Sequence, residues 1–585
     1  GKGIFAHEVG TGKTLTMAAL AMESRRLGIS SKPILLAHNA NSLAVRNEIQ
    51  EAYPASNILY VDNLDAATKG QTLQAIATEN WDLIVVPHSM AENFQLRPET
   101  VRALLQPQMD ALEAAAQEAY EESDASDFAK GTMPADLDTM TAEDLRTLKE
   151  PTAKDLVRER LKLRAMIDKA VQAMDKGTGV FFEDMGVDMV MVDEAHLFKK
   201  LPITSRQTIK GLNKAASQMG TMMMMMTDYI RSNNNGRGVY MFTGTPITNT
   251  INEIYNMMRF VMAEEMDASS VLQWDSWFNN FATQETQTEL SSGGTWENFD
   301  RLSSFVNLPE LRQMVGQYMD IVFADDMPEF TPRENREGRS ENPVGRPFKQ
   351  IHNVIIDMID AQRAHSEALK QRYTTFKNSS GRDKVRMMKE PGGMFNPLVI
   401  EGEGVKLAMD PRLAGYGTKE VDDALVTDTS KLDPKDPNLK INKMIGNAMI
   451  HYHEHPKTAQ MIFMQVGYTD WAERTVGRDR GGKAIKQKFR VFNLAKEIKR
   501  RLIEEGVPEN EIAIFSGMSK EKRTEAASLM QQGLVRFAIG STETMGTGIN
   551  AQDELIAMHH LDAPWMPGDL EQRNGRGHRQ GNRWN

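Results

Sequence analysis

Short runs of apolar residues alternate with longer helical patterns from the beginning of the chain. The first helical pattern is Leu15–Arg26. Leu83–Val86 and Met189–Val192 are wholly apolar, as expected for strands that are buried on both faces of a sheet. This alternation predicts an α/β fold with a parallel sheet. The predicted strands of this first part are Ile4–Ala6, Pro33–Ala37, Ile58–Val61, Asp82–Pro87 and Met189–Val192.

The strand signal is lost between about residues 94 and 188. This stretch is rich in Ala, Glu, Leu and Lys, and its apolar positions, such as Leu104, Leu105 and Leu112, lie near helical spacing. We therefore expect a helical insertion inside a first lobe that spans residues 1–260. Its acidic middle, Ser123–Thr152, contains Gly131 and is expected to be a hinge or a loosely ordered tip.

Residues 261–429 are expected to be helices and long loops that link two lobes. Strand signals resume after residue 430, with intervening helices at Val491–Glu505 and Lys520–Gln532. The second lobe is predicted to span residues 430–585 and to be cut short at its C-terminal end. Its predicted strands are Met461–Met464, Ile512–Phe515, Val535–Ile539 and Leu555–His560.

The composition excludes several classes of function but does not identify one. The 585 residues include no cysteine, which excludes disulfides, thiolate zinc sites and a cysteine nucleophile, and favours a reducing compartment such as the cytoplasm. Ala215–Thr227, the longest uncharged Met-rich stretch, is too short to cross a bilayer, so no membrane association is expected. The net charge is −11, but residues 113–150 alone hold eleven acidic and three basic residues, which leaves the rest near neutral. The acidic total is therefore weak evidence against a nucleic-acid partner.

The segment HEVGTGKT, His7–Thr14, follows an apolar strand and precedes a helical pattern. Gly10 and Gly12 allow the backbone to wrap phosphates, Lys13 can reach the β- and γ-phosphates, and Thr14 can hold magnesium. The general pattern has a glycine at the position of His7. A chance Gly-rich turn is the alternative.

A second motif, MVMVDEAH, is an apolar strand that ends in two adjacent carboxylates. Asp193 is suited to magnesium and Glu194 to an attacking water, and these are the two needs of phosphoryl transfer. An acidic loop that caps the next helix is the alternative.

A third motif, MFTGTPITN, carries Thr243, Gly244 and Thr245 after another strand. Small hydroxyl residues beside the carboxylate strand can link the nucleotide state to movement between lobes. An ordinary β-turn is an equally good interpretation.

The C-terminal region carries IGSTETMGTGIN, Ile539–Asn550, and LEQRNGRGHRQGN, Leu570–Asn582. Gln572, Arg576 and Arg579 share one helix face if this segment is helical. Arginine forks can stabilise charge on a γ-phosphoryl group in the transition state. A basic, solvated tail is the alternative.

Taken in order, these motifs together with PILLAHN and DLIVVPHS resemble those of superfamily 2 helicases, specifically the Swi/Snf-like double-stranded DNA translocases. Three segments, AHEVGTGKT, NLPEL and HHLDAPWMPGDLEQRNGRGHRQGN, carry a narrower resemblance. They resemble the helicase half of phage and plasmid proteins that fuse an adenine methyltransferase to a Swi/Snf-like helicase, including phage anti-restriction proteins. The resemblance covers nearly the whole chain.

The resemblance implies two RecA-like lobes with ATP between them, Mg²⁺ as the metal and double-stranded DNA as the partner. Lys13, Asp193, Glu194, Arg576 and Arg579 would be catalytic, and Thr14 and Asp193 would hold the metal. The expected nucleotide-binding residues are Gly10, Thr11, Gly12, Lys13, Thr14 and Gln572. The expected coupling residues are His196, Thr243, Gly244 and Thr245. The expected DNA-binding residues are Asn39, His88, Ser89, Ser541, Thr542, Gly546, Gly548 and Asn550.

The chain lacks the adenine-recognition segment that normally precedes the phosphate loop, and it contains no NPPY-type or DPPY-type tetrapeptide. We therefore expect any methyltransferase domain to lie upstream in a longer polypeptide, which could be carried in a phage particle. Two other functions remain open: an RNA-directed helicase, and a scaffold or virion protein with a vestigial nucleotide site.

Other features are expected to be structural. The five methionines Met222–Met226 are predicted to lie in a buried helix, since methionine fills irregular cores. The pair His559 and His560 is predicted to be core, and His451, His453 and His455 are predicted to lie in a polar loop. The basic, Pro-rich stretch Arg333–Lys349 is either a DNA contact or a solvated linker, with equal weight.

Overall fold

The computed structural model describes the chain except at residues 9, 40, 63, 65–67, 124–125, 127–129, 134–136, 138–143, 176–178, 199, 204, 206–216, 248–251, 291–295, 324–325, 328–346, 348, 389–393, 422–423, 479–483, 546–550, 565–566, 580 and 585. The chain folds as two compact units. Unit 1 is Gly1–Gln287 with Asp300–Asp326, and unit 2 is Thr288–Phe299 with Met327–Asn585. The division into residues 1–260, 261–429 and 430–585 stays a prediction.

Unit 1 is built on a parallel sheet, which confirms the predicted fold class. Within the described residues this sheet has seven strands in the order β3-β4-β2-β5-β6-β1-β9, and each neighbouring pair is parallel. The order places β5 in the middle of the sheet, with β6 and β1 next to it on one side. The strands are β1 (Gly3–His7), β2 (Pro33–Ala37), β3 (Ile58–Tyr60), β4 (Leu83–Pro87), β5 (Met189–Val192), β6 (Val239–Thr243) and β9 (Met319–Val322).

Alternate side chains of these strands enter two separate cores. Leu35 and Ala37 of β2 pack with α1 and α2, whereas Ile34 and Leu36 pack with the helices on the other face. Because successive side chains of a strand point to opposite faces, a strand covered on both sides reads as a continuous apolar run. The predicted interior positions of Leu83–Val86 and Met189–Val192 are confirmed.

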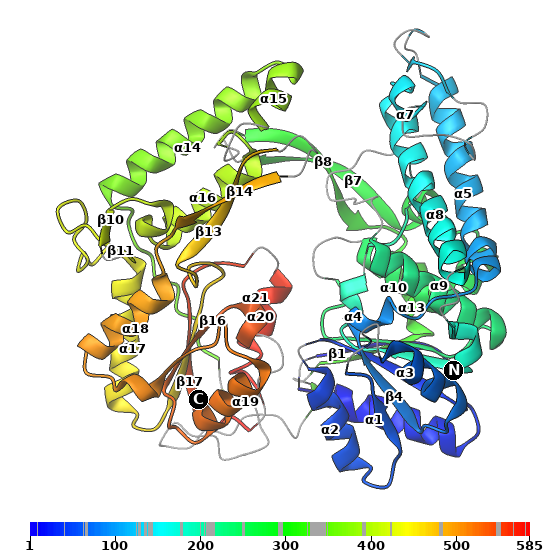
Figure 1. Cartoon of the computed structure of the whole chain (residues 1–585), viewed down its shortest axis with the longest axis horizontal. Helices are drawn as coiled ribbons and strands as arrows, with labels where there is room; N and C mark the ends of the chain where they lie inside the picture. Colours follow the sequence, from blue (N-terminus) through cyan, green and yellow to red (C-terminus); the bar gives the residue numbers. More distant parts are fainter. Residues whose placement is uncertain are drawn as a thin grey trace. The chain divides into compact units, whose positions relative to one another are not determined.

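The helices of unit 1 alternate with its strands along the chain, as the sequence pattern predicts (Figure 1). The short 3-10 segments are η1 (Phe182–Met185) and η2 (Ala195–Phe198). The α-helices are α1 (Lys13–Arg26), α2 (Ser42–Ala52), α3 (Lys69–Thr78), α4 (His88–Ala91), α5 (Pro98–Glu121), α7 (Asp144–Thr147), α8 (Pro151–Asp175), α9 (Gln218–Asn233), α10 (Asn252–Val261), α11 (Ala263–Ala268), α12 (Trp274–Phe281) and α13 (Leu308–Gly316).

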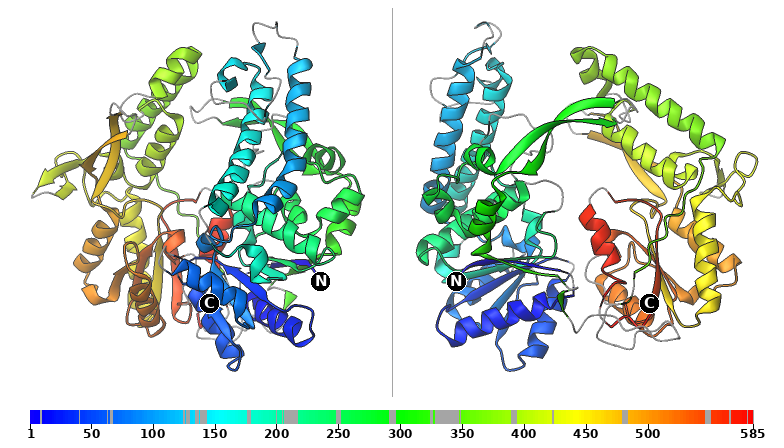
Figure 2. Two further views of the ribbon diagram at one scale, coloured as in Figure 1. Left: turned by 45° about the vertical axis from the view of Figure 1, so that its right-hand side comes forward. Right: turned by 180° about the vertical axis from the view of Figure 1, so that it is seen from behind.

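The predicted insertion consists of helices, as expected. Its long helices α5 and α8 lie side by side in both views (Figures 1 and 2). Leu105 and Leu112 of α5, which contribute to the predicted helical periodicity, are buried in the same core as Leu163 of α8. About half of the acidic segment at residues 123–152 lies outside the described residues, and the described part includes α7 and the start of α8.

All five methionines Met222–Met226 are buried in α9, which confirms their predicted core position. Consecutive residues on a helix point in all directions, so five buried neighbours require packing all around the helix. The helix α9 meets this requirement because it packs against the sheet, α5 and α10.

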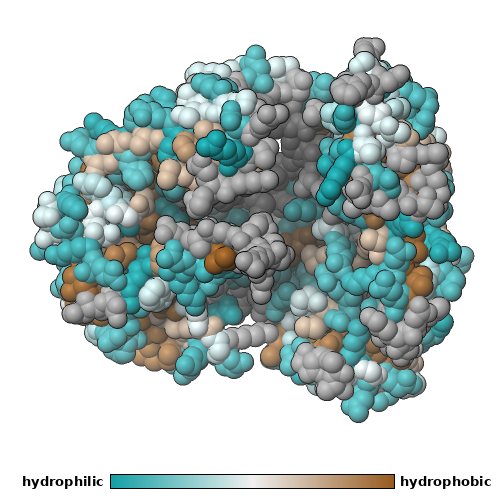
Figure 3. Space-filling model, turned by 45° about the horizontal axis from the view of Figure 1, so that its top comes forward, coloured by the Kyte–Doolittle hydropathy of each residue, from teal (hydrophilic) through white to brown (hydrophobic). Residues whose placement is uncertain are grey.

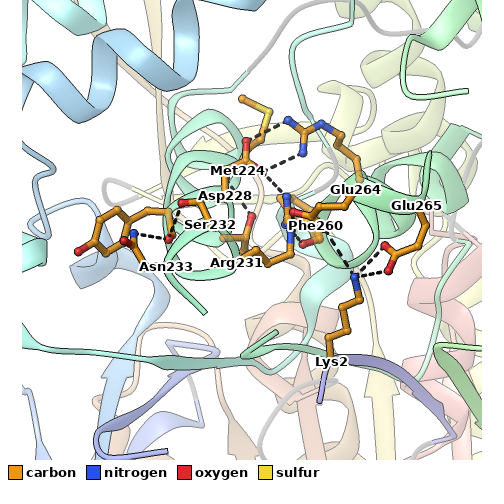
Figure 4. A network of polar contacts seen from close by, with 12 residues as sticks. Lys2, Met224, Asp228, Arg231, Ser232, Asn233, Phe260, Glu264 and Glu265 are labelled. Atoms are coloured by element: carbon orange, nitrogen blue, oxygen red, sulfur yellow. Dashed lines mark hydrogen bonds and ion pairs between the residues drawn. The ribbon is translucent and has the colours of Figure 1, made fainter. Parts of the chain in front are cut away.

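A buried ion network fastens the beginning of β1 to helices α9, α10 and α11 (Figure 4). Asp228 accepts two hydrogen bonds from Arg259, at 2.8 and 2.9 Å, and contacts Arg231. Burial alone would raise the pKa of Asp228, but these two guanidinium groups outweigh it and lower the pKa. Arg231 also bonds Glu264 at 2.9 Å, and Lys2 bonds the neighbouring Glu265 at 2.7 Å.

Unit 2 contains a smaller parallel sheet with the order β15-β16-β12-β17 among the described residues. Its strands are β12 (Ala459–Phe463), β15 (Ile512–Ile514), β16 (Phe537–Gly540) and β17 (Leu555–His560). Ile462 and Ile539 face a core with α17 and α18, while Met461 and Ala538 face a core on the other side of the sheet. The strands predicted after residue 430 are confirmed.

The helices of unit 2 cover this sheet and extend from it. The short 3-10 segments are η6 (Pro411–Ala414) and η7 (Glu509–Glu511). The α-helices are α14 (Asp360–Asn378), α15 (Gly381–Met388), α16 (Pro397–Met409), α17 (Lys440–Glu454), α18 (Leu494–Glu504), α19 (Lys520–Gln531), α20 (Thr542–Met545) and α21 (Pro567–Asn574).

Three two-stranded antiparallel ribbons were not predicted, nor was β9. They are β7 (Ala282–Leu290) with β8 (Trp296–Phe305), β10 (Thr418–Val421) with β11 (Ala424–Thr427), and β13 (Trp471–Arg478) with β14 (Ala484–Arg490). Residues 261–429 therefore hold strands as well as helices and loops. These strands escape prediction because most of their described side chains are exposed or only half-buried, so little apolar alternation marks them in the sequence.

Two expectations about histidines were wrong. His451 and His453 lie in the last turn of α17, and His455 is its C-cap, so they do not form a loop. His560 is exposed at the end of β17 and stacks on Phe463, whereas His559 is half-buried and bonds Gln460 at 2.9 Å. The edge position of β17 in its sheet explains the exposure.

Hydrophilic residues dominate the face shown in Figure 3, and hydrophobic ones are scattered over it. Every helix in the described part of the chain is too short or too polar to pass through a bilayer.

Candidate functional site

The carboxyl ends of β1, β5 and β6 bring three of the four predicted motifs to one edge of the unit 1 sheet. The phosphate loop follows β1, Asp193 and Glu194 follow β5, and Thr243 ends β6. Because the strands are parallel neighbours, these segments lie next to one another. Ligands of open α/β sheets bind at this kind of edge.

The phosphate loop has the backbone conformation that its glycines permit. Gly10 and Gly12 have φ values of 90° and 87°, in the left-handed region that favours glycine. Gly12 is the N-cap of α1 and provides no side-chain cap, so the first N–H groups of α1 remain available to an anion. Thr11 bonds the carbonyl of Glu8 at 2.8 Å, which closes the loop.

Lys13 folds over this loop. Its Nζ donates to the carbonyl oxygens of His7 and Glu8, at 2.9 and 3.2 Å. These are weak neutral acceptors for an ammonium group, and charged phosphate oxygens are stronger ones. The arrangement fits a lysine that exchanges loop carbonyls for phosphates.

The two carboxylates differ in environment. Asp193 is buried, and burial, assisted by the charge of Glu194 and opposed by that of Lys13, raises its pKa well above the ordinary value. Glu194 adopts φ 48°, a left-handed conformation that costs a non-glycine residue about 1 kcal/mol or more. Such strain is found at functional sites, where the surrounding structure holds it in place.

The site suits magnesium. A buried carboxylate with a raised pKa gains from a nearby cation, and Thr14 adds a hydroxyl oxygen at the start of α1. Mg²⁺ prefers oxygen ligands and is commonly held by one or two protein groups together with substrate phosphates. The described residues hold no group of three or more His, Asp or Glu side chains suited to a metal on their own.

His196 connects the carboxylates to the third motif. Its Nδ1 lies 2.9 Å from the hydroxyl of Thr243 and 3.4 Å from the carboxylate of Glu194. The same hydroxyl accepts the backbone N–H of Thr245 at 3.0 Å, across Gly244. The structure therefore joins three of the predicted coupling residues, His196, Thr243 and Thr245, by hydrogen bonds.

The predicted DNA-contacting residues of unit 1 lie further along the same edge, after β2 and β4. Asn39 accepts the backbone N–H of Ser89 at 2.9 Å. The ring of His88 is buried and donates from Nε2 to the carbonyl of Asp193 at 2.9 Å. Burial, reinforced by the neighbouring His38, lowers the pKa of His88 to about 3. The neutral ring of His88 thus supports the carboxylate segment from inside the unit.

The corresponding edge of the unit 2 sheet carries Ser541 and Thr542 after β16. Ser541 and Thr544 bond each other through hydroxyl and backbone groups, which shapes the short helix α20. The remaining predicted residues of this segment, Gly546, Gly548 and Asn550, lie outside the described residues.

The helix that carries Gln572 is shorter than the spacing argument requires. Helix α21 ends at Asn574, so Arg576 and Arg579 lie in the turns that follow it and do not share a helix face with Gln572. The two glycines Gly575 and Gly577 follow the last helical residue, and the N–H of Arg576 bonds the carbonyl of Arg573 at 3.0 Å in a tighter turn. The prediction of one shared face depended on a helix that continues through Arg579, and this condition is not met.

A buried arginine cluster in unit 2 escaped sequence analysis. Arg573 has no exposed surface and donates to the hydroxyl of Thr542 at 2.8 Å and to Asp562 at 3.0 Å. Gln465 bonds both partners, its backbone N–H to Asp562 at 2.6 Å and its side chain to Thr542 at 2.9 Å. The cluster joins the ends of β12, β16 and β17 to α21. No sequence pattern indicates this cluster, because arginine is rarely buried.

A second contact that the sequence did not predict involves His7, at the position where the phosphate-loop pattern has glycine. Its Nε2 lies 2.7 Å from the carboxylate of Asp320 in β9, and its ring packs edge-on against Phe5. The backbone N–H of Glu8 also bonds the carbonyl of Val322 at 3.0 Å. Strand β9 therefore holds the beginning of the phosphate loop.

Two family models match the chain. One described as a probable helicase domain matches residues 1–322, and one described as a helicase conserved C-terminal domain matches residues 483–581.

Among curated proteins, Defense against restriction protein B of Escherichia phage P1 is 24% identical over 485 residues, which is 68% of this chain and 21% of that protein. The chain thus spans about a fifth of the length of this relative.

Two solved structures are examples of those that resemble this chain. The Sulfolobus solfataricus SWI2/SNF2 ATPase core in complex with dsDNA is 12% identical, with a TM-score of 0.28 over 100% of this chain and 81% of that chain. The Pyrococcus furiosus Hef helicase domain is 10% identical, with a TM-score of 0.38 over 99% and 90%.

The predicted resemblance to helicases is confirmed by the family matches, and the match to a phage anti-restriction protein agrees with the narrower likeness. Since the first family model covers more than half of its length, this chain belongs to the probable helicase domain family.

Proposed function

We propose that the chain is an ATP-dependent translocase motor that moves along double-stranded DNA. The observation that carries the proposal is the edge of the unit 1 sheet, where the phosphate loop, the two carboxylates and the His196–Thr243 contact follow adjacent strands. The Swi/Snf-like order of the motifs supports duplex DNA as the polymer. The likeness to an anti-restriction protein supports a place in a larger phage or plasmid protein linked to DNA modification or anti-restriction.

The residues of unit 1 divide the chemistry among them. The backbone N–H groups after Gly10 and Gly12 wrap the phosphates, and Lys13 moves from its loop carbonyls to the β- and γ-phosphates. Thr14 and Asp193 would hold Mg²⁺, which supplies neutralisation of phosphate charge when bound. Glu194 orients the attacking water and accepts its proton.

His196 then transmits the state of the site. Loss of the γ-phosphate changes the position of Glu194, and His196 passes this change to Thr243 through the two contacts of its Nδ1. Asn39 and Ser89 on the same edge, with Ser541 and Thr542 in unit 2, are proposed to contact the DNA backbone. Backbone contacts carry no base information, so the motor is expected to act without sequence preference.

The test is the rate of ATP hydrolysis with duplex DNA, with single-stranded DNA, with RNA and with no polymer. We expect duplex DNA to raise the rate most, and Lys13→Ala to abolish turnover. A larger stimulation by RNA would assign the chain to RNA-directed helicases. Absence of turnover in the unmodified chain would favour a vestigial site on a scaffold protein.

A further inference from the structure

The ribbon of β13 and β14 has a composition unlike the rest of the chain. From Trp471 to Arg490 the sequence holds seven basic residues against Glu473 and Asp479, a net charge of +5 in a chain with a net charge of −11. The ribbon leaves the sheet after β12 and returns at α18. Its first strand lies between residues 322 and 483, in the part of the chain that neither family model matches.

The register of the ribbon aligns its cations. Lys486, Lys488 and Arg490 alternate along β14, so they lie on one face of the ribbon. Trp471 pairs with Arg490 and Glu473 with Lys488 across the two strands, which puts both on this same face. We call this face, with Trp471, Glu473, Lys486, Lys488 and Arg490, the cationic face.

The two lysines of the cationic face are open to solvent, whereas the side chain of Arg490 is 18% exposed and lies 3.4 Å from Glu420. The side chain of Lys486 is 63% exposed, and Lys488 is also exposed. Glu473 lies 3.4 Å from Lys486, an exposed pair of the kind that contributes about 1 kcal/mol or less and is readily exchanged. Arg490 stacks on the half-exposed Trp471 ring at 4.1 Å, which holds the guanidinium group in place.

The spacing and charge of this face fit a nucleic-acid backbone. Alternate residues of a strand are about 6.8 Å apart. Phosphates on one strand of B-DNA rise about 3.4 Å each along the axis and also rotate around it, so neighbouring phosphates lie farther apart than this rise and can be reached by a row of exposed cations. The opposite face offers only Ile485 and Phe489 as exposed hydrophobic side chains among its described residues, which is too little apolar surface for a stable protein interface.

We infer that the β13–β14 ribbon is an accessory binding element that contacts the phosphate backbone of duplex DNA through its cationic face. The inference rests on the proposed function, because it gives the motor a second hold on the same polymer. It adds a contact that none of the helicase motifs supplies. Contacts to phosphates make this hold independent of DNA sequence.

The experiment compares Lys486→Gln/Lys488→Gln with a matched control, Lys370→Gln/Lys431→Gln. The control lysines are also exposed, each has one acidic neighbour, at 3.9 and 3.6 Å, and the change in net charge is identical. Binding of the full chain to a fluorescent duplex is measured from 50 to 300 mM salt. A thermal melt checks that both variants remain folded.

Each phosphate contact contributes about 0.9 to the slope of log affinity against log salt. We therefore expect the ribbon variant to flatten this slope by about 1.8 and to lower affinity on the order of tenfold at 100 mM salt, while the control matches the unmodified chain. Equal slopes for the ribbon variant and the control would overturn the inference. A ribbon-dependent loss seen with RNA and not with duplex DNA would also overturn it.

Failure of the ribbon and failure of the motor are distinguishable. If the unmodified chain binds duplex DNA and hydrolyses ATP in response to it, but the ribbon variant does so with an unchanged salt slope, only the ribbon inference falls. If the unmodified chain neither binds duplex DNA nor responds to it, the proposed function falls and the ribbon inference falls with it.

Discussion

Removal of the buried guanidinium group of Arg573 tests whether the cluster in unit 2 holds the ends of three strands together. In Arg573→Ala the hydroxyl of Thr542 loses a donor at 2.8 Å and Asp562 loses its ion pair at 3.0 Å. The side chain of Asp562 is 4% exposed, so its charge would remain in the interior without the arginine. Breaking one side of a buried ion pair destabilises a protein by about 3–5 kcal/mol.

The assay is amide hydrogen exchange of the full chain, followed by mass spectrometry of peptides from each unit. A loss of about 3–5 kcal/mol lowers the protection of globally exchanging amides by roughly 10² to 10³·⁵, since 1.36 kcal/mol corresponds to a factor of ten. We expect this loss in peptides from β12 and β16, while peptides from β4 and β5 in unit 1 keep their protection. Arg573→Lys keeps the charge without the fork and should have an intermediate effect.

The matched control is Arg583→Ala. Arg583 bonds Glu554 at 3.2 Å, but its side chain is 58% exposed, so its removal should cost about 1 kcal/mol or less. If β16 loses no more protection in Arg573→Ala than in Arg583→Ala, the cluster does not stabilise the unit, and the reasoning about buried charge is refuted.

Three further predictions concern unit 1 and the arginine motif. The single variants His7→Ala and Asp320→Ala should each raise the KM for ATP about threefold. The double variant should raise the KM no further, because each single variant already removes the same His7–Asp320 contact. Additive effects on the KM would contradict this contact's role. In the folded state the pKa of Asp228 is lower than its ordinary value near 3.9. Its ionised carboxylate therefore stabilises the fold at pH values above about 3.9, and this stabilisation is lost as the pH falls through the folded-state pKa. Acid unfolding followed by circular dichroism should therefore be less steep in Asp228→Asn, and an unchanged profile would exclude this ion network as the cause. Arg576→Ala and Arg579→Ala should each lower kcat for ATP by roughly 10³, with little change in KM, if they stabilise the transition state; a change in KM alone would contradict that role.

Elements with two buried faces could be predicted from the sequence, and elements without a buried face could not. The runs around Leu83–Val86 and Met461–Met464 are apolar because helices cover both sides of each sheet. The ribbon strand Ala484–Arg490 alternates cations with other residues and contributes to no core, so its pattern lacks the hydrophobic signal. The alternating cations of this strand, which remove the hydrophobic signal, are also the basis for its proposed contact with DNA phosphates.

The candidate site was predictable where function fixes residue types at fixed spacing. Lys13, Asp193 and Thr243 come from separate motifs, and parallel pairing of their strands brings them to one edge. Arg573 and Asp320 could not be found in this way, because their roles depend on partners that are distant in sequence and on burial that single residues do not reveal. The spacing argument for Arg576 failed because it counted helical turns across Gly575 and Gly577.

The central claim is that ATP hydrolysis at the edge of the unit 1 sheet drives movement along duplex DNA. The most direct measurement is the displacement of a third strand from a DNA triplex, followed with ATP, without nucleotide, and with the Lys13→Ala variant. The account predicts displacement by the unmodified chain with ATP alone. Displacement that persists without nucleotide, or in Lys13→Ala, would contradict it, as would its absence while duplex DNA still stimulates hydrolysis.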